Sequence, residues 1–221
     1  MPETLISNHT LKSPDRYFKI FALLLFTTIS CNISAQKKVN GYQVNYYITG
    51  VKQSEGNYKN SLQDSTWKYY YPDGKINRIT NYDKGVKNGR SVSYNKNGNL
   101  VSDVNYKNGK FFDTVKFYYP NGQLNFKEYY DANSFEQGEF KLWYKSGKLS
   151  QYGIMHNGKL VGKWMKYYEN GQTEDTEYYD AEGKKDSVWL YYSSDGKLMK
   201  SEKYKADSLL KTTIVDTVLK R

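Results

Sequence analysis

A phrase of thirteen residues that returns at a fixed interval constrains this chain more than any other feature. Residues 118–130 read YYPNGQLNFKEYY, and residues 167–179 read YYENGQTEDTEYY. Related phrases carry glycines at spacings of 24, 24, 25, 24 and 25 residues, and a further step of 24 reaches Gly50. A period of this length is typical of a repeat architecture, so we expect seven units. The six clearer turn glycines are Gly74, Gly98, Gly122, Gly147, Gly171 and Gly196.

Each unit has the sequence pattern of a β-hairpin. Asn or Asp precedes the glycine in five of the seven units. Asn-Gly and Asp-Gly favour a two-residue type I′ turn, which needs positive φ at both residues. We therefore expect positive φ at both Asn121 and Gly122. The hairpins would be joined by looser return loops, whose glycines, such as Gly138, should tolerate substitution better.

The expected fold is all-β: an elongated, single-layer antiparallel β-meander of about seven 24-residue hairpin repeats. The chain has 24 tyrosines but a hydrophobic fraction of 38%. A sheet one layer thick has no dry interior for aliphatic residues, whereas tyrosine packs its ring and keeps its hydroxyl hydrated. Residues 36–207 would form the array, and residues 208–221 a β-prone C-terminal cap.

Side-chain alternation along a strand assigns the two faces of the sheet. We count positions from each turn glycine, so Trp164 stands at −7 of the Gly171 unit. Positions −7, −5, −3, +2 and +8 are expected on one face, which would be the buried one because it collects Trp67, Trp164 and Trp189. The opposite face would carry the aromatic residues at −4. They would either hold the sheet together or bind a ligand, and the candidates are Tyr70, Tyr94, Tyr118, Trp143, Tyr167 and Tyr192.

Residues 1–35 have the order of a secretory signal peptide. Lys12, Arg16 and Lys19 precede the apolar run 20–29, and small residues follow. The run has ten residues, about half of the ~20 that a membrane-spanning helix needs. Two processing sites compete: cleavage after Ala35, and lipidation of Cys31 in the lipobox-like TISC. We expect an exported protein, periplasmic or associated with the cell envelope.

Chemistry-bearing residues are sparse after residue 35. This part contains one histidine, His156, and no cysteine, so neither a His/Cys metal site nor a nucleophile pair is expected. The glycine spacings do not match phosphate-binding loops. Paired carboxylates can hydrolyse glycosides, but the acids here stand among many lysines and predict a solvated charged face. We expect no cofactor and no catalysis. The acids that cluster in one unit are Glu169, Glu174, Asp175, Glu177 and Asp180.

The phrase GKWMKYYENGQ at residues 162–172 resembles the variant MORN repeat of bacterial proteins, many of which carry an antitoxin label. The likeness recurs in register over residues 40–205. It implies β-hairpin meanders that contact a protein or a membrane surface without catalysis. The Gly98 unit departs from the pattern, with Ser91 at the tryptophan position and Asn95 in place of the second tyrosine.

These features predict a non-catalytic, exported scaffold that binds a protein partner or the cell envelope. Without residues 1–35 the chain keeps 30 Lys and Arg against 21 Asp and Glu, a net charge of +9. Its lysines suit anionic lipid or acidic polysaccharide, whereas export argues against a nucleic-acid partner. Two alternatives stay open: a glycan-binding or glycan-hydrolysing envelope protein, and an antitoxin-like protein that binds a toxin. The signal peptide argues against the second.

Overall fold

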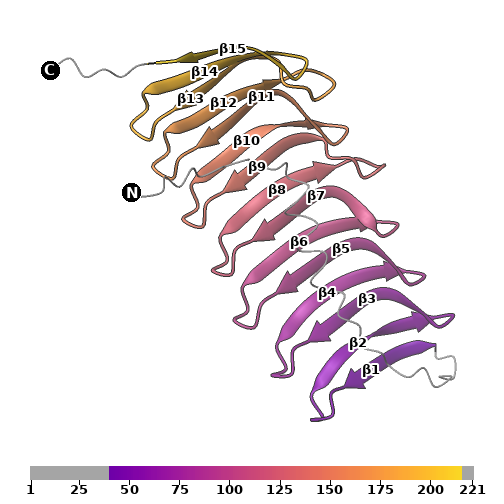
Figure 1. Ribbon diagram of the computed structural model, residues 1–221. Coiled ribbons are helices and arrows are strands. Elements are labelled where there is room, and N and C mark those ends of the chain that lie inside the picture. The colour runs from indigo at the N-terminus through magenta and orange to yellow at the C-terminus, as the bar shows by residue number, and fades with distance from the viewer. Residues whose placement is uncertain (1–39, 216–221) are drawn as a thin grey trace, which may run out of the picture. The chain divides into compact units, whose positions relative to one another are not determined.

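The computed structural model describes residues 40–215, which form one antiparallel sheet of fifteen strands. Each strand pairs with its neighbours in chain order (Figure 1). The predicted signal peptide (residues 1–35), with Cys31 and Ala35, and residues 216–221 lie outside the described residues. The strands are β1 Gly41–Tyr46, β2 Lys52–Lys59, β3 Leu62–Tyr70, β4 Ile76–Asp83, β5 Val86–Tyr94, β6 Leu100–Lys107, β7 Lys110–Tyr118, β8 Leu124–Tyr130, β9 Gly138–Trp143, β10 Leu149–His156, β11 Lys159–Tyr167, β12 Thr173–Tyr179, β13 Ser187–Tyr192, β14 Leu198–Lys205 and β15 Ser208–Ile214.

The all-β, single-layer meander is confirmed. Seven hairpins, from β1/β2 to β13/β14, each enclose one turn glycine, and β15 pairs with β14. Residues 40–215 contain no helix that could cross a membrane. A sheet with one layer must bury its apolar side chains against neighbours in the same sheet, and this requirement explains the strict repetition.

The turns at the repeat glycines differ from expectation. The Tyr119 N–H donates to the Gln123 carbonyl and the Gly122 N–H donates to the Tyr119 carbonyl, both at 2.8 Å. Gly122 has φ of 88°, but Asn121 is not among the positive-φ residues. The predicted type I′ turn is therefore wrong here. The loop has three residues and ends in a left-handed glycine, an arrangement common after a type I turn.

Two-residue turns of the predicted type lie at the other end of the strands, where looser loops were expected. Asn108 and Gly109 have φ of 52° and 80°, and Asn157 and Gly158 have 49° and 74°. Both central residues are left-handed, as a type I′ turn requires. The longer connections are β8–β9 and β12–β13, and at each of these two junctions two residue pairs join the strands.

Every unit also has a left-handed residue at −9, two positions before the tryptophan position. Gly138 occupies this site with φ of 73°, a left-handed conformation like that of Gly122, so its greater tolerance stays a prediction. The glycine of the G-x-W phrase is explained by this kink in the strand, where a side chain would be strained. The seven residues are Gly41, Ser65, Gly89, Asp113, Gly138, Gly162 and Ser187.

The three-residue turn also shifts the register close to it. Trp164 pairs with Glu177, so −7 lies opposite +6, but Tyr118 pairs with Leu124, so −4 lies opposite +2. Residues directly opposite share a face. The assignment of +2 to the tryptophan face is therefore wrong. The aliphatic residues at +2 lie on the aromatic face, the one that carries the −4 column, and they are Ile76, Leu100, Leu124, Leu149 and Leu198.

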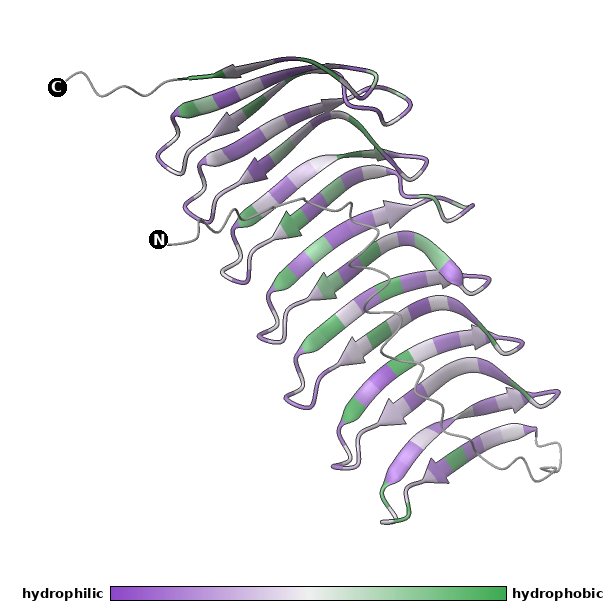
Figure 2. Cartoon of the chain, in the orientation of Figure 1, coloured by the Kyte–Doolittle hydropathy of each residue, from purple (hydrophilic) through white to green (hydrophobic). Residues whose placement is uncertain are grey.

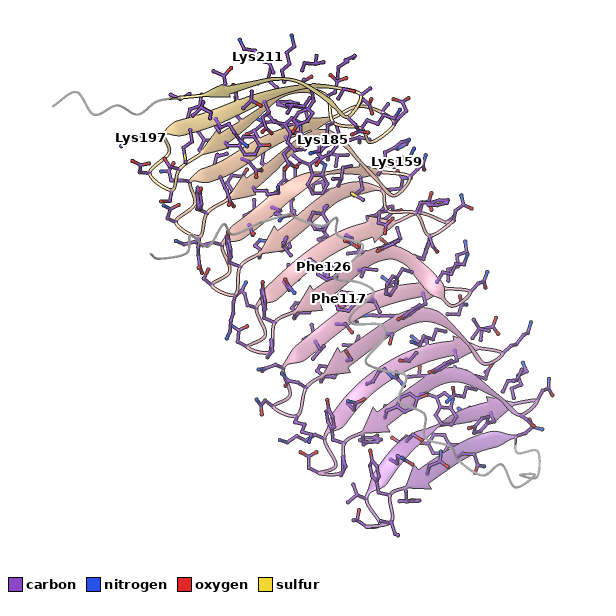
Figure 3. All side chains as sticks on the ribbon, in the orientation of Figure 1. Phe117, Phe126, Lys159, Lys185, Lys197 and Lys211 are labelled. Atoms are coloured by element: carbon purple, nitrogen blue, oxygen red, sulfur yellow. The ribbon has the colours of Figure 1, made fainter. Side chains whose placement is uncertain are left out.

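The tryptophan face holds most of the core, as expected for positions −7 and +8. Trp67 is 1% exposed, Val115 0% and Trp164 3%. Phe117 stacks on Phe126 with ring centroids 4.7 Å apart (Figure 3). These contacts run from strand to strand within the sheet, which replaces the missing second layer.

Neighbouring units match each other in side-chain size on this face. A Cβ atom at Gly153 would lie 2.2 Å from the Trp164 ring, and one at Gly56 would lie 2.5 Å from Trp67. Val104 instead pairs with Val115. Trp67 and Trp164 at −7 are thus each accommodated by a glycine at +6 of the preceding unit.

We expect Gly153→Ala to lower the free energy of unfolding by about 1–3 kcal/mol, because the added methyl overpacks the site against Trp164. Urea unfolding would measure the loss. The double variant Gly153→Val/Trp164→Val reproduces the Val104/Val115 arrangement, so its loss should be smaller than the sum of the two single losses. Additive losses would contradict the size match.

Candidate binding surface on the aromatic face

The two tyrosines of each Tyr-Tyr phrase have different roles. The second, at −3, crosses to the next unit: the Tyr119 hydroxyl donates to the Trp143 carbonyl at 2.9 Å, and the Tyr144 hydroxyl to the Tyr167 carbonyl at 2.6 Å. These hydroxyls satisfy carbonyls near the turns and join successive hairpins. The same bond is made by Tyr47, Tyr71, Tyr119, Tyr144 and Tyr168.

Asn95 keeps the lateral bond in the unit that lacks the second tyrosine. Its Nδ2 donates to the Pro120 carbonyl at 3.0 Å. Its Oδ1 accepts from the backbone N–H groups of Asn97 and Asn99, both at 3.0 Å. The departure from the repeat pattern therefore changes the residue but preserves the connection to the next hairpin.

The asparagines before the turn glycines also act through their side chains. The Oδ1 of Asn121 accepts from the Gln123 N–H at 3.2 Å, and its Nδ2 donates to the Lys145 carbonyl at 3.3 Å. Asn170 repeats both bonds, to Gln172 and Ser194. These asparagines therefore act by hydrogen bonding within the turn and across to the next unit, rather than through the positive φ expected of them.

The first tyrosine of each phrase belongs to the aromatic stripe, which we define as the residues at −4 and +2. All six candidates at −4 are partly exposed. Figure 2 shows hydrophobic colour at the start of β4, β6, β8, β10 and β14, where the aliphatic +2 residues lie. The ring contacts described for residues 40–215 do not join any two −4 residues. The cross-strand pairs are Tyr70–Ile76, Tyr94–Leu100, Tyr118–Leu124, Trp143–Leu149, Tyr167–Thr173 and Tyr192–Leu198.

The stripe is apolar along most of its length but has a polar end. The Tyr70 hydroxyl bonds the Glu55 carboxylate, and the Lys52 amine lies 2.9 Å from it. These two partners lower the pKa of Glu55 to about 2. In the centre of the sheet, the hydroxyls of Tyr94 and Tyr118 make no hydrogen bond within residues 40–215, so they stay available to a ligand.

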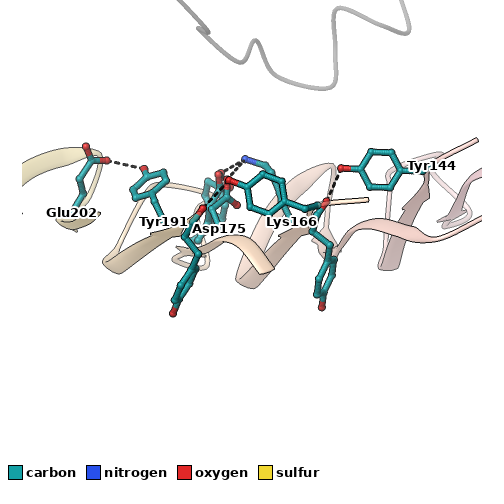
Figure 4. A network of polar contacts seen from close by, with 10 residues as sticks. Tyr144, Lys166, Asp175, Tyr191 and Glu202 are labelled. Atoms are coloured by element: carbon teal, nitrogen blue, oxygen red, sulfur yellow. Dashed lines mark hydrogen bonds and ion pairs between the residues drawn. The ribbon is translucent and has the colours of Figure 1, made fainter. Parts of the chain in front are cut away.

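The acidic cluster lies partly on the opposite face and is not simply a solvated charged surface. Lys166 Nζ is 3.2 Å from Asp175 and 2.5 Å from Glu177 (Figure 4). The two acids are 5% and 6% exposed. The interpretation as a solvated charged face is therefore wrong for this pair, although Glu169 is exposed.

This arrangement is suited to structure rather than to hydrolysis. Glycoside hydrolysis needs two carboxyl groups on either side of an accessible bond, whereas Asp175 and Glu177 share one lysine in a buried site. Burial raises the pKa of Asp175 to about 6. Glu177 also accepts from the Tyr179 hydroxyl at 2.7 Å, so its oxygens are committed within the sheet.

Metal ligation finds no support between residues 40 and 215. This part of the chain has no group of three His, Cys, Asp or Glu side chains that could hold an ion. His156 precedes a type I′ turn, with its Nε2 3.3 Å from Asn157 Nδ2. The aromatic stripe is thus the candidate binding surface, because its side chains are only partly engaged in contacts that hold the sheet together.

Comparison with known proteins identifies the repeat. Five segments match the family model described as MORN repeat variant, at residues 63–84, 87–108, 114–132, 136–157 and 160–181. Each segment begins before or within one strand and ends in or just after the next, so one match corresponds to one hairpin. This confirms the resemblance to the repeat for these five units, but it does not extend to the antitoxin label. No curated protein matches the sequence.

Solved structures give weak similarity. The crystal structure of TcdB2-TccC3-Cdc42 has 13% identity and a TM-score of 0.21, covering 80% of this chain and 12% of that chain. TcdB2-TccC3 without its hypervariable C-terminal region also has 13% identity, with a TM-score of 0.22, covering 73% of this chain and 11% of that chain. This chain therefore spans about an eighth of the length of the chains it matches.

The adjacent tyrosines of one phrase allow a matched test of the lateral bond. Tyr119→Phe should lower the free energy of unfolding by about 0.5–1.5 kcal/mol, because it removes the hydrogen bond to the Trp143 carbonyl. Tyr118→Phe, one residue earlier, should change it by less. Urea unfolding of both variants would measure the difference, and equal losses would show that the −3 hydroxyl has no special structural role.

Glu128 gives the sheet a predictable pH dependence. Burial raises its pKa to about 7 from an ordinary 4.5, so its contribution to stability is most favourable below pH 4.5 and is lost as the pH rises to 7. Glu128→Gln can still accept the Tyr130 hydroxyl, which lies 2.8 Å from Glu128. The variant should be more stable than the wild type at pH 8, by about 1–3 kcal/mol, and similar to it at pH 4.

Glu202 is the control of opposite sign for the same unfolding measurements. Burial opposes its ionisation, but bonds from Lys200, Tyr191 and Tyr204 hold its pKa below the ordinary value. Its ionised form therefore stabilises the fold above the ordinary pKa, and Glu202→Gln should destabilise the protein at pH 8. If both variants were destabilised at pH 8, the assigned state of Glu128 would be wrong.

Proposed function

We propose that this chain, five of whose hairpins match the MORN repeat variant, is a non-catalytic scaffold that binds an elongated partner along the aromatic stripe. The observation that carries the proposal is the division of roles within each repeat. Positions −9, −7, −3, +6 and +8 form the kink, the core and the lateral bonds. The −4 rings recur with the same strictness but remain partly exposed.

The composition of the stripe supports a binding role. Partly exposed aromatic rings provide a large contact area with a polar tip, and contiguous exposed apolar surface marks interaction sites more often than chance. Aliphatic +2 residues lie on the strands between the rings of successive hairpins. The partner that suits such a stripe is long and narrow, and it lies across the strands.

The rival functions have less support. A glycan hydrolase would need accessible acids, and the Lys166 site holds Asp175 and Glu177 buried. An antitoxin-like role would require a cytoplasmic protein partner. Glycan binding without hydrolysis stays compatible with the aromatic stripe.

Export is part of the proposal and rests on the order of residues within 1–35. The partner would then be a protein or a surface of the cell envelope, either anionic lipid or polysaccharide. N-terminal mass spectrometry of the protein from its native host should find Gln36 or a lipidated Cys31 at the start. An intact chain from Met1 in the cytoplasm would refute export.

Removal of the central rings tests the binding role. Tyr118→Ala/Trp143→Ala should reduce retention on the host's envelope fraction at least fivefold per folded molecule. The variant should remain folded, because each ring is only half-buried and its loss should cost no more than about 1–2 kcal/mol. Retention would be measured by quantitative co-sedimentation, and folding by thermal melting.

Two exposed aromatic residues outside the stripe provide the control. Tyr129 is 43% exposed and Phe135 is 50% exposed, and Tyr129→Ala/Phe135→Ala should leave retention unchanged. If the stripe variant melts far below the control while its retention per folded molecule stays at the wild-type value, the rings hold the sheet together and the binding role is refuted.

A further inference from the structure

One row of side chains crosses the aromatic face from β1 to β15, because positions −6 and +5 pair directly at every junction. We call it the central row. It lies beside the aromatic stripe, since −6 is two residues from −4 on the same strand. Its members in order are Val44, Glu55, Lys68, Ile79, Val92, Asp103, Lys116, Lys127, Lys141, Tyr152, Met165, Thr176, Leu190, Ser201 and Thr213.

Charges in the central row are paired favourably except at one place. Glu55 lies opposite Lys68, and Asp103 opposite Lys116. Lys116, however, lies directly opposite Lys127, and Lys127 directly opposite Lys141. Like charges facing each other across strands ~4.8 Å apart are destabilising. The three lysines on consecutive strands therefore destabilise the sheet at β7–β9.

The neighbouring acids neutralise this lysine triplet only in part. Asp103 is already bound by Arg90, at 2.7 Å from Nε and 2.9 Å from Nη2. Glu139 bonds Lys141 at 2.8 Å. Within residues 40–215, the amines of Lys116 and Lys127 form no ion pair and no hydrogen bond. The four cations and two acids named here leave an excess of two positive charges.

The lysine triplet lies at one of the two junctions with the fewest residue pairs, so its repulsion does not help to hold the sheet together. β8 joins β9 through Phe126↔Leu142 and Lys127↔Lys141, so one of these two pairs is repulsive. At the similarly short β12/β13 junction, the central row has Thr176 opposite Leu190. Neutral residues therefore serve this position well, and an anion placed over the lysines would turn a repulsive junction into a bridged one.

We propose that Lys116, Lys127 and Lys141 bind an acidic polysaccharide that lies along the sheet, across β7, β8 and β9. The inference rests on the proposed binding role of the aromatic stripe and names its ligand. Tyr118 and Trp143 follow Lys116 and Lys141 by two residues on the same strands. The anionic groups of the polymer would contact the lysines, and the apolar faces of its sugar rings would pack on the stripe.

The spacing of the rings favours a polysaccharide over single-stranded nucleic acid. Stacked bases gain energy from an aromatic partner for each base. Tyr118 and Trp143 lie on strands two steps apart, ~10 Å, with Leu124 between them. The C–H face of a sugar can pack on leucine as well as on an aromatic ring. Isolated lysines also act as point charges, which suits a polymer that repeats single charges.

Affinity for polygalacturonate, measured by calorimetry at two salt concentrations, tests the proposal. The wild type should bind it, more weakly at high salt, and should not bind neutral dextran. Lys116→Gln/Lys127→Gln/Lys141→Gln should weaken binding at least about tenfold. The matched control, Lys59→Gln/Lys110→Gln/Lys159→Gln, removes three exposed charges beside the two-residue turns and should weaken it less than about threefold. Equal loss in both variants would show that net charge alone attracts the polymer and would overturn the site.

Hydrogen exchange gives a second readout that net charge would not move. Polygalacturonate should protect the amides of β8 and β9 in the wild type and in the control, but not in the lysine variant. The lysine variant alone should be at least as stable as the wild type, because it removes the repulsion. Protection spread evenly over all strands, or a lysine variant that melts lower, would count against the site.

The test separates this inference from the proposed function. If Tyr118→Ala/Trp143→Ala loses the envelope fraction while the lysine variant retains it and polygalacturonate does not bind, the stripe role survives and the polysaccharide is wrong. If the lysine variant loses polygalacturonate but the stripe variant keeps both ligands, the lysine site survives and the stripe role is wrong. Lysine-dependent binding to phosphatidylglycerol vesicles or to a single-stranded oligonucleotide, without binding to polygalacturonate, would overturn the ligand class.

Discussion

The contact between one hairpin and the next is the interaction on which the whole structure depends. A single sheet cannot bury a face against a second layer, so each unit must gain its stability from its two neighbours. Three kinds of contact supply it: ring and aliphatic packing on the tryptophan face, backbone pairing through the sheet, and lateral bonds at both strand ends. At the three-residue turns the bond comes from a tyrosine hydroxyl, as from Tyr119 to Trp143. At the two-residue turns it comes from a backbone N–H, as from Gly109 to Lys87.

This dependence separates the residues that hold the sheet from those that are free to bind. The −3 hydroxyls, the buried −7 side chains and the −9 kinks are all used in contacts between or within units. The −4 rings are used least, although they recur as strictly. On the tryptophan face, the buried Lys166–Asp175–Glu177 group shows that polar side chains can also serve the interior, where a lysine shared by two acids replaces apolar packing.

Much of this fold follows from the spacing of the glycines and aromatic residues. The period identified the hairpins, and the alternation placed Trp67, Trp164 and Trp189 on the buried face. The turn type was missed because Asn-Gly suits two conformations: a type I′ turn, and a type I turn in which the asparagine side chain bonds the backbone. Because the loop at Asn121 has three residues instead of two, position +2 lies opposite −4. The leucines at +2 are therefore on the aromatic face, not on the tryptophan face. The glycine of the G-x-W phrase marks the left-handed kink at −9, a signal separate from the Asn-Gly turns.

The site was less accessible to sequence reasoning than the fold. The −4 column could be found from its period, but the lysine triplet depends on pairing across three strands. Lys127 stands at +5, while Lys116 and Lys141 stand at −6, so no single repeat position collects them. The exact register on both sides of β8 was needed to bring them together.

The size match between Gly153 and Trp164 limits how an array of this kind can grow during evolution. Duplication of a hairpin places its own +6 residue against its own −7 residue. A copied β3/β4 hairpin would put Thr80 against Trp67, where the present neighbour is Gly56. Such a copy must therefore be accompanied by a change in side-chain volume at the seam, and the order of these hairpins becomes an inherited property of the chain. The units look alike, but they are not interchangeable.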